Sequence, residues 1–161
     1  MELGSEFELN MADLDIVDDT IFSYLNKYGS VYTNSGRSAA KLLNSILPRG
    51  TILLPSYICQ SVIDVYEQDF TIEYYQINER FEIDLVDLEN KIDDSVVAVY
   101  LMHYFGRLQS NTILDVLVKL KDQFHYLIIE DTTHSIFSCT NTIGDFCVCS
   151  LRKWFPIPDG G

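Results

Sequence analysis

Basic residues are scarce in this chain. Its 161 residues include 11 lysines and arginines against 24 aspartates and glutamates, which gives a formal net charge of −13 at pH 7. Proteins bind nucleic acids and anionic membranes through Lys and Arg that neutralise phosphate, and an acidic chain lacks the means to do so. The composition therefore argues against both partners, and solubility alone accounts for the acidity.

Long hydrophobic runs are absent as well. No apolar stretch approaches the ~20 residues of a membrane-spanning helix, and acids rather than bases follow Met11, so we expect no signal peptide there. Residues 1–10 resemble a cloning-vector leader, because two adjacent cloning sites encode Gly-Ser-Glu-Phe. Its three glutamates account for the change from −13 to −10 when the leader is left out. We expect residues 11–161 to form one cytoplasmic domain with a hydrophobic core.

Cysteine is also infrequent, and the chain has no C-x-x-C pair. The four cysteines stand among apolar neighbours, which is typical of reduced thiols in the core of a cytoplasmic protein. They are Cys59, Cys139, Cys147 and Cys149. Cys147 and Cys149 would share one face of a strand, where Cys59 or His134 could complete a zinc site. Such sites normally use a second closely spaced pair of ligands, so we expect no metal.

Short apolar runs alternate with amphipathic segments along the chain. Continuous or β-branched runs predict strands at residues 51–54, 70–77, 96–104, 126–130 and 146–149. Apolar residues at helical spacing predict helices at residues 11–28, 38–47, 56–68, 81–93 and 112–124. The run 96–104 is apolar on both faces, as in the centre of a parallel sheet. This alternation predicts an α/β fold, with a mostly parallel sheet flanked by helices.

Ligands of parallel sheets bind at the carboxyl ends of strands and at the N-termini of helices. Gly36 opens a predicted helix whose free N–H groups could hold a phosphate, with Arg37 and Ser38 as side-chain donors. A plain helix start is the alternative. Tyr57 follows the first strand, and its ring could lie over a planar cofactor or simply be half-buried in a loop.

Two charged residues follow later strands. Asp131 comes directly after a buried strand, where a carboxylate needs a donor or cation as partner unless it caps the next turn. Lys153 follows the last strand, next to Trp154 and Phe155. Desolvation by these rings would favour a neutral, nucleophilic amine suited to Schiff-base chemistry, whereas a lysine that merely packs its stem on the rings is the alternative.

Together these features match the three ends of pyridoxal phosphate. The lysine would bind the aldehyde carbon, the aspartate would keep the pyridine nitrogen protonated, and the helix start would hold the phosphate. Because each member is weak evidence alone, the joint match carries the prediction of a pyridoxal-phosphate enzyme.

The order of these motifs resembles the DegT/StrS group of sugar aminotransferases, pyridoxal-phosphate enzymes of fold type I. The resemblance runs over residues 32–161. SGRSAA resembles the phosphate-binding helix start, and LLPSYICQSVI resembles the segment with the ring-stacking aromatic. FEIDLVDLENKI followed by VVAVYLMHYFG resembles the family's helix, strand and His-x-aromatic-Gly. IIEDTTHS resembles the stretch that contacts the pyridine nitrogen and ring hydroxyl, and KWFPIPDGG resembles the end of the lysine segment.

The resemblance implies a catalytic lysine, Lys153, within a set of cofactor-binding residues. The set is Gly36, Arg37, Ser38, Tyr57, Asp131, His134, Ser150 and Lys153. Asp131 would pair with the pyridine nitrogen and His134 would contact the ring hydroxyl. The implied reaction transfers an amino group from an amino-acid donor to a keto-sugar or similar acceptor, in a homodimer. A dehydratase of the same family and a non-catalytic interaction domain remain as alternatives.

The sequence also departs from the family pattern. Val148 stands five residues before the lysine, where the family has a phosphate-binding serine, so Ser150 or Arg152 would have to take over. Cys59, rather than Tyr57, aligns with the stacking aromatic. Family members are considerably longer, so we expect this chain to be a truncated N-terminal part of the large domain that is inactive alone.

Overall fold

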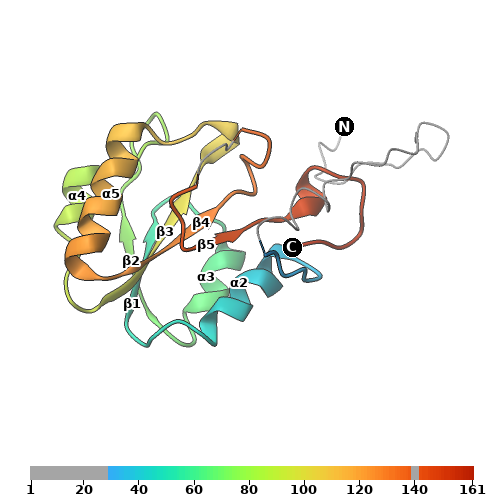
Figure 1. Ribbon diagram of the computed structural model, residues 1–161, viewed down its shortest axis with the longest axis horizontal. Helices are drawn as coiled ribbons and strands as arrows, with labels where there is room; N and C mark the ends of the chain where they lie inside the picture. Colours follow the sequence, from blue (N-terminus) through green and yellow to red (C-terminus); the bar gives the residue numbers. More distant parts are fainter. Residues whose placement is uncertain (1–28, 139–141) are drawn as a thin grey trace.

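Five parallel strands form a single sheet in the computed structural model, which describes residues 29–138 and 142–161 (Figure 1). Their order across the sheet is β2-β1-β3-β4-β5. The strands are β1 (Thr51–Pro55), β2 (Thr71–Tyr75), β3 (Val96–Met102), β4 (Leu127–Asp131) and β5 (Phe146–Val148). The prediction of a parallel α/β fold is confirmed. The leader, the helix predicted at 11–28 and Cys139 lie outside the described residues.

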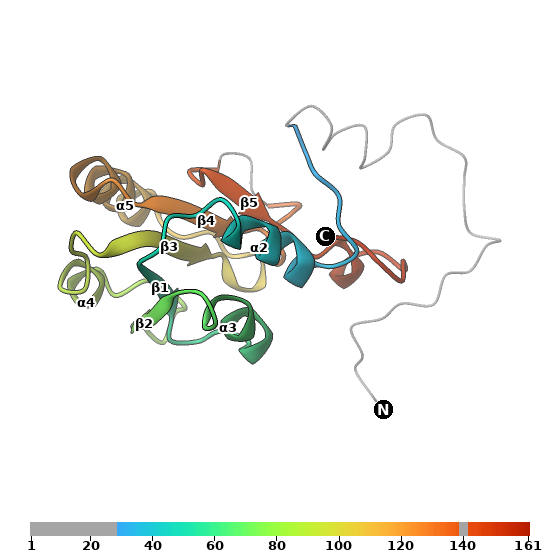
Figure 2. The ribbon, with the colours of Figure 1, turned by 90° about the horizontal axis from the view of Figure 1, so that it is seen from below.

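Helices cover both faces of the sheet (Figures 1 and 2). They are α2 (Gly36–Asn44), α3 (Gln60–Tyr66), α4 (Leu85–Glu89) and α5 (Asn111–Phe124), and two 3-10 turns occupy Tyr104–Gly106 and Leu151–Lys153. Buried residues of α2 and α3 pack on one face, and those of α4 and α5 pack on the other. No helix in the described ranges is long and apolar enough to cross a membrane.

The two faces have separate hydrophobic cores because side chains alternate along each strand. Leu53, Val99 and Leu101 point toward α4 and α5, whereas Leu54 and Tyr100 point toward α2 and α3. The central strand β3 therefore buries both of its faces, which explains its unbroken apolar run.

Several predicted elements are shorter in the structure than in the sequence analysis. The helix predicted from residue 56 begins only at Gln60, because Ser56 is tied to the edge strand: its N–H donates to the carbonyl of Tyr75, and its hydroxyl accepts from the N–H of Ile77. Since the N–H of Ile77 is used in this way, β2 ends at Tyr75 rather than at residue 77. The helix predicted in 81–93 covers only the five residues of α4.

The strand order reverses between β1 and β3. The chain leaves β1 for its outer neighbour β2 and then returns to β3 on the other side of β1. Connections that leave two adjacent strands toward opposite faces open a crevice at the strands' carboxyl ends, where α/β proteins bind ligands. The fold thus predicts a site beyond the carboxyl ends of β1 and β3.

Candidate functional site

A cavity of about 550 Å³ lies at that edge of the sheet. Residues that follow β1, β3, β4 and β5 line it together with the first turn of α2. Seven of the eight predicted cofactor-binding residues are among them: Gly36, Arg37, Tyr57, Asp131, His134, Ser150 and Lys153. The structure therefore brings together residues that are distant in sequence, as the motif analysis requires.

Ser38 is the predicted residue that does not line this cavity. The hydroxyl of Ser35 caps α2 by accepting from the N–H of Ser38 (3.2 Å), and the Ser38 hydroxyl donates to Oδ1 of Asn34 (2.5 Å). Ser38 faces a neighbouring hollow instead. Its side chain serves the helix cap here, and its role toward a cofactor stays a prediction.

The start of α2 is held close to the loop after β5. A Cβ atom on Gly36 would lie 3.1 Å from Cβ of Ser150, so the two segments meet with little space between them. The N–H groups of Thr33 and Gly161 each donate to the other residue's carbonyl, at 2.8 and 2.9 Å. A Cβ on Gly161 would overlap the backbone of Ser35, so the paired glycines allow this close approach. Figure 2 shows the two segments side by side.

Asp131 ends β4 with a carboxylate that is buried and accepts one hydrogen bond at each oxygen. Its Oδ2 accepts from the hydroxyl of Tyr100 (2.7 Å) and its Oδ1 accepts from the N–H of Thr133 (2.8 Å). The partners that the sequence analysis required are thus present. Burial, and then the negative charge of Asp131, raise the pKa of Tyr100 well above its ordinary value, so this phenol remains a proton donor. The sequence analysis missed Tyr100, although a tyrosine within an aliphatic run signals a hydroxyl that needs a partner.

Glu130 points to the opposite face of the sheet and anchors a buried polar network. Its Oε1 lies 3.0 Å from Nε2 of His103, and its Oε2 accepts from the N–H groups of Ile143 and Gly144, both at 2.8 Å. Burial raises the pKa of Glu130, but hydrogen bonds from His103 and from these two N–H groups outweigh that effect and hold the pKa below its ordinary value.

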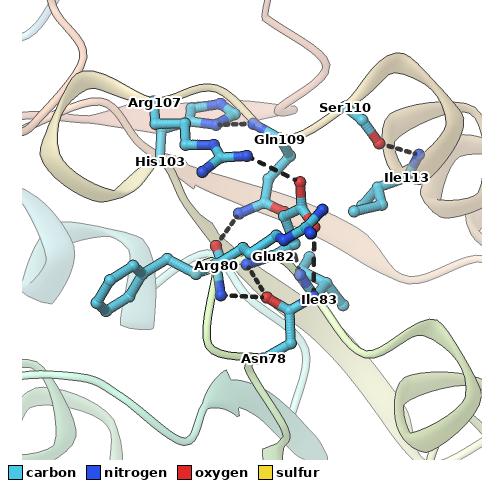
Figure 3. A network of polar contacts seen from close by, with 10 residues as sticks. Asn78, Arg80, Glu82, Ile83, His103, Arg107, Gln109, Ser110 and Ile113 are labelled. Atoms are coloured by element: carbon cyan, nitrogen blue, oxygen red, sulfur yellow. Dashed lines mark hydrogen bonds and ion pairs between the residues drawn. The ribbon is translucent and has the colours of Figure 1, made fainter.

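The same network fixes the segment that follows β3 (Figure 3). The N–H of Gln109 donates to Nδ1 of His103 (3.2 Å), and the Gln109 side chain accepts from Ile83 and donates to the carbonyl of Phe81. Nδ1 accepts here, so the proton of His103 lies on Nε2, facing Glu130. Buried groups that satisfy one another in this way hold the turn at Tyr104–Gly106 rigidly beside the cavity.

Aromatic side chains form one wall of the cavity. The ring of Tyr57 is 57% exposed, and its carbonyl accepts from the hydroxyl of Tyr104 (2.6 Å). Phe105 stacks on His134 with centroids 5.6 Å apart. The φ angle of Phe105 is +55° and that of Phe81 is +60°, an unusual backbone conformation for bulky residues that is concentrated at functional sites.

Lys153 is exposed, so the predicted desolvation of its amine is wrong. The flanking rings pack elsewhere: Trp154 donates its indole N–H to the carbonyl of Thr133 and meets Phe137 edge to face, and Phe155 also packs on Phe137. The rings are therefore not available to cover the lysine amine.

The cavity is positively charged although the chain is strongly acidic. Arg37, Arg152 and Lys153 line it, and its one lining acid is Asp131. Among residues 29–138 and 142–161, none of these three cations belongs to an ion pair. Three unpaired cations around one cavity indicate an anionic ligand.

The cysteines differ from the prediction of core thiols. Cys59 and Cys147 are exposed and Cys149 is half-buried, all three as free thiols. Cys59 lines the cavity, and the hydroxyl of Ser61, 3.2 Å from Sγ, lowers the pKa of this thiol. Burial raises the pKa of Cys149 to about 12. In the part of the chain that the structure describes, no group of His, Cys, Asp or Glu is arranged to hold a metal ion.

Comparison with known proteins rests on structure, since no family model and no curated protein sequence matches the chain. A protein from Streptococcus pneumoniae described as a sugar aminotransferase, in its pyridoxal-phosphate form, matches with a TM-score of 0.70 and 20% identity, over 81% of this chain and 40% of that one. A GDP-4-keto-6-deoxymannose-3-dehydratase matches with a TM-score of 0.66 and 19% identity. The match covers 80% of this chain and 37% of that one. Alanine aminotransferase from Pyrococcus furiosus matches with a TM-score of 0.58 and 17% identity. The match covers 65% of this chain and 29% of that one.

These likenesses establish the fold. The sheet and its helices are arranged as in the large domain of fold-type-I enzymes, as expected from the sequence. The chain spans less than half the length of each of these neighbours.

Proposed function

We propose that this chain forms the cofactor-binding part of a pyridoxal-phosphate-dependent aminotransferase of the DegT/StrS kind. Its substrates would be an amino-acid donor and a keto-sugar or a similar carbonyl acceptor. One observation carries the proposal: the buried carboxylate of Asp131 and the amine of Lys153 line the same cavity as the start of α2. These are the three groups that the cofactor's nitrogen, aldehyde and phosphate require.

The residues present fit this cofactor. A protonated ring nitrogen needs a fixed anionic acceptor, and Asp131 is fixed by Tyr100 and Thr133. A phosphate needs N–H donors and cations, which the start of α2 and Arg37 supply. The cavity volume of about 550 Å³ is within the range of small-molecule sites.

The chain's own groups would perform distinct tasks. When bound, pyridoxal phosphate supplies an electron sink for the substrate's α-carbon. Lys153 would hold the cofactor and, once its Nζ is free, accept the substrate's α-proton and return it. His134, stacked on Phe105, would contact the ring hydroxyl. Because Lys153 is exposed, we propose that a second copy of the protein covers it and excludes water, as in a homodimer.

Cofactor titration tests the proposal directly. We expect a pyridoxal-phosphate titration to give a saturable absorbance change, and borohydride reduction followed by peptide mapping to find the adduct on Lys153. Lys153→Ala should abolish the adduct. Lys119→Ala is the matched control, because Lys119 is an exposed lysine on α5 and does not line the cavity. Label spread over surface lysines, or no adduct, would support a non-catalytic interaction domain instead.

A sugar dehydratase is the second candidate, because the likeness to the dehydratase structure is almost as close as that to the sugar aminotransferase. Both reactions use the same cofactor site, so the adduct does not distinguish them. Product analysis of a full-length version with a keto-sugar does: an aminated sugar that appears only with an amino donor identifies the aminotransferase, and a deoxygenated sugar identifies the dehydratase. We expect neither product from the 161-residue chain alone.

A further inference from the structure

We propose that Arg152 is the principal cation that binds the cofactor's phosphate in this chain. The inference rests on the function proposed above, and it chooses Arg152 over Ser150 and Arg37 among the residues that could bind the phosphate. Three observations support it: the position of Arg152, its lack of an ion-pair partner, and the absence of a hydroxyl at the end of β5.

The position of Arg152 follows from the turn after β5. The 3-10 turn Leu151–Lys153 begins where the strand ends and buries Leu151, which leaves the side chains of Arg152 and Lys153 on the lining of the cavity. Ser150 and Gly36, at the start of α2, line the same cavity. A guanidinium here shares the cavity with the N–H groups to which a phosphate would bind.

The side chain of Arg152 is half-buried and forms no ion pair with any described residue. A partly desolvated charge without a partner is unfavourable, so a bound anion would stabilise it. The planar guanidinium donates two parallel hydrogen bonds to phosphate oxygens. Arg37 is the competing candidate, but it is exposed and also faces the second hollow, where water screens its charge.

The end of β5 offers no hydroxyl in the place of a phosphate-binding serine. Val148 is buried in the core beneath α2 and α3. Ser150 lies beyond the strand end and lines the cavity, and its N–H donates to the hydroxyl of Thr133 (3.0 Å). A serine hydroxyl is neutral, so Ser150 could donate to a phosphate but not compensate its charge, which Arg152 would do.

The test compares pyridoxal phosphate with pyridoxal, which lacks the phosphate, by absorbance titration of the full chain. We expect Arg152→Gln to weaken pyridoxal phosphate about 10- to 100-fold, the range for losing a charge-assisted hydrogen bond, and to leave pyridoxal unchanged. Arg152→Lys should lose less affinity for pyridoxal phosphate, because it keeps the positive charge but not the planar guanidinium that donates two parallel hydrogen bonds. Arg80→Gln is the control, since Arg80 is exposed, unpaired and outside the cavity.

Thermal unfolding of each variant distinguishes a loss of binding from a loss of folding. If Arg152→Gln does not fold, a folded Arg152→Lys still allows the two ligands to be compared with wild type. Equal affinity of Arg152→Gln and wild type for pyridoxal phosphate, or an equal loss for both ligands, would overturn the inference. Failure of the proposed function would give a different pattern, because no adduct would form on Lys153. Inorganic phosphate would still bind, as measured by phosphorus NMR line broadening, and Arg152→Gln would abolish that binding.

Discussion

At the residue scale, hydrogen bonds rather than ion pairs hold the carboxylate of Asp131. The carboxylate accepts from the phenol of Tyr100 and from the backbone N–H of Thr133, so its partners are neutral groups rather than cations. The cations of the cavity therefore remain available for a ligand. One cavity thus contains a carboxylate that is fixed by neutral donors and three cationic side chains that form no ion pair with any described residue.

Tyr100→Phe tests how much the phenol contributes. The substitution keeps the ring in the core but leaves Oδ2 of Asp131 without its donor, and losing a hydrogen bond to a charged group costs about 1.5–3 kcal/mol. Urea unfolding should show a loss of that size. Tyr126→Phe is the matched control, because its hydroxyl donates to the neutral carbonyl of Leu117, and it should lose only about 1 kcal/mol. Equal losses would contradict the assignment.

Glu130 makes the stability of the protein depend on pH. Its pKa is lowered in the folded state, so its contribution is fully present above the unfolded value of about 4.3 and is lost as the pH falls through the folded value. Glu130→Gln weakens the hydrogen bonds that the carboxylate accepts from His103, Ile143 and Gly144, and should cost about 1.5–3 kcal/mol at pH 7. We expect the difference from wild type to shrink as the pH falls below about 4.

The control for this experiment is Glu89→Gln, an exposed acid at the end of α4, which should change stability by less than about 0.5 kcal/mol. If the difference between Glu130→Gln and wild type stayed constant from pH 7 to pH 3, the ionised carboxylate of Glu130 would not be the source of the stability.

The chemical identity of the site residues was predictable at this scale, but their orientation was not. Asp131 was found because a charged side chain directly after a buried strand is unusual, and Lys153 because it stands next to aromatic residues in the loop after the last strand. Whether Trp154 covers the lysine depends on Phe137, which lies in a loop that local patterns do not place. The direction of the Ser38 side chain depends likewise on Asn34, one helical turn away.

At the element scale, α2 combines a cap with a close contact. Gly36 has a helical backbone, so its value lies in the space that it leaves beside Ser150. Alanine would favour the helix by about 1 kcal/mol, but its Cβ would press on Ser150 at 3.1 Å and narrow the cavity beside the helix start.

Gly36→Ala should therefore change the free energy of unfolding by less than about 1 kcal/mol, because the two effects oppose each other. It should nevertheless weaken binding of pyridoxal phosphate, measured by absorbance titration. Gly29→Ala is the control for a glycine lost outside the cavity: its added Cβ meets no atom within 4 Å, but its φ of +67° strains an alanine, so this variant should lose stability and keep its affinity for pyridoxal phosphate. Unchanged cofactor affinity in Gly36→Ala would show that the ligand does not use this contact.

The existence and order of the elements could be predicted, whereas several of their ends could not. Helix α5 was predicted to within one residue of its start, because its apolar stripe is long and regular. The start of α3 was not, since Ser56 is held by β2, a partner that local patterns cannot reveal. Short elements such as α4 depend on tertiary contacts, which override local propensity.

At the scale of the whole molecule, the sheet has two edge strands, β2 and β5. Within the described residues neither outer edge is paired, and unpaired strand edges promote association. This agrees with the proposal that a second copy completes the site.

We expect sedimentation velocity to show concentration-dependent association. Cys147→Lys adds a charge to the exposed edge strand β5 and should reduce association. Thr71→Lys places the same charge on the opposite edge strand, β2, and should have no effect if β5 is the edge that associates. A monomer at high concentration would contradict the proposed dimer.

Because Thr33 and Gly161 are joined by two backbone hydrogen bonds, the two segments that contain them should open together. The bridge joins the segment before α2 to the residues after the lysine turn, so neither segment separates from the other without breaking the same backbone bonds. The amide protons of Thr33, Gly160 and Gly161 should therefore exchange with solvent deuterium at similar protection factors. A ligand that bridges α2 and Arg152 would slow all three together, so isotope exchange at these amides would report ligand binding.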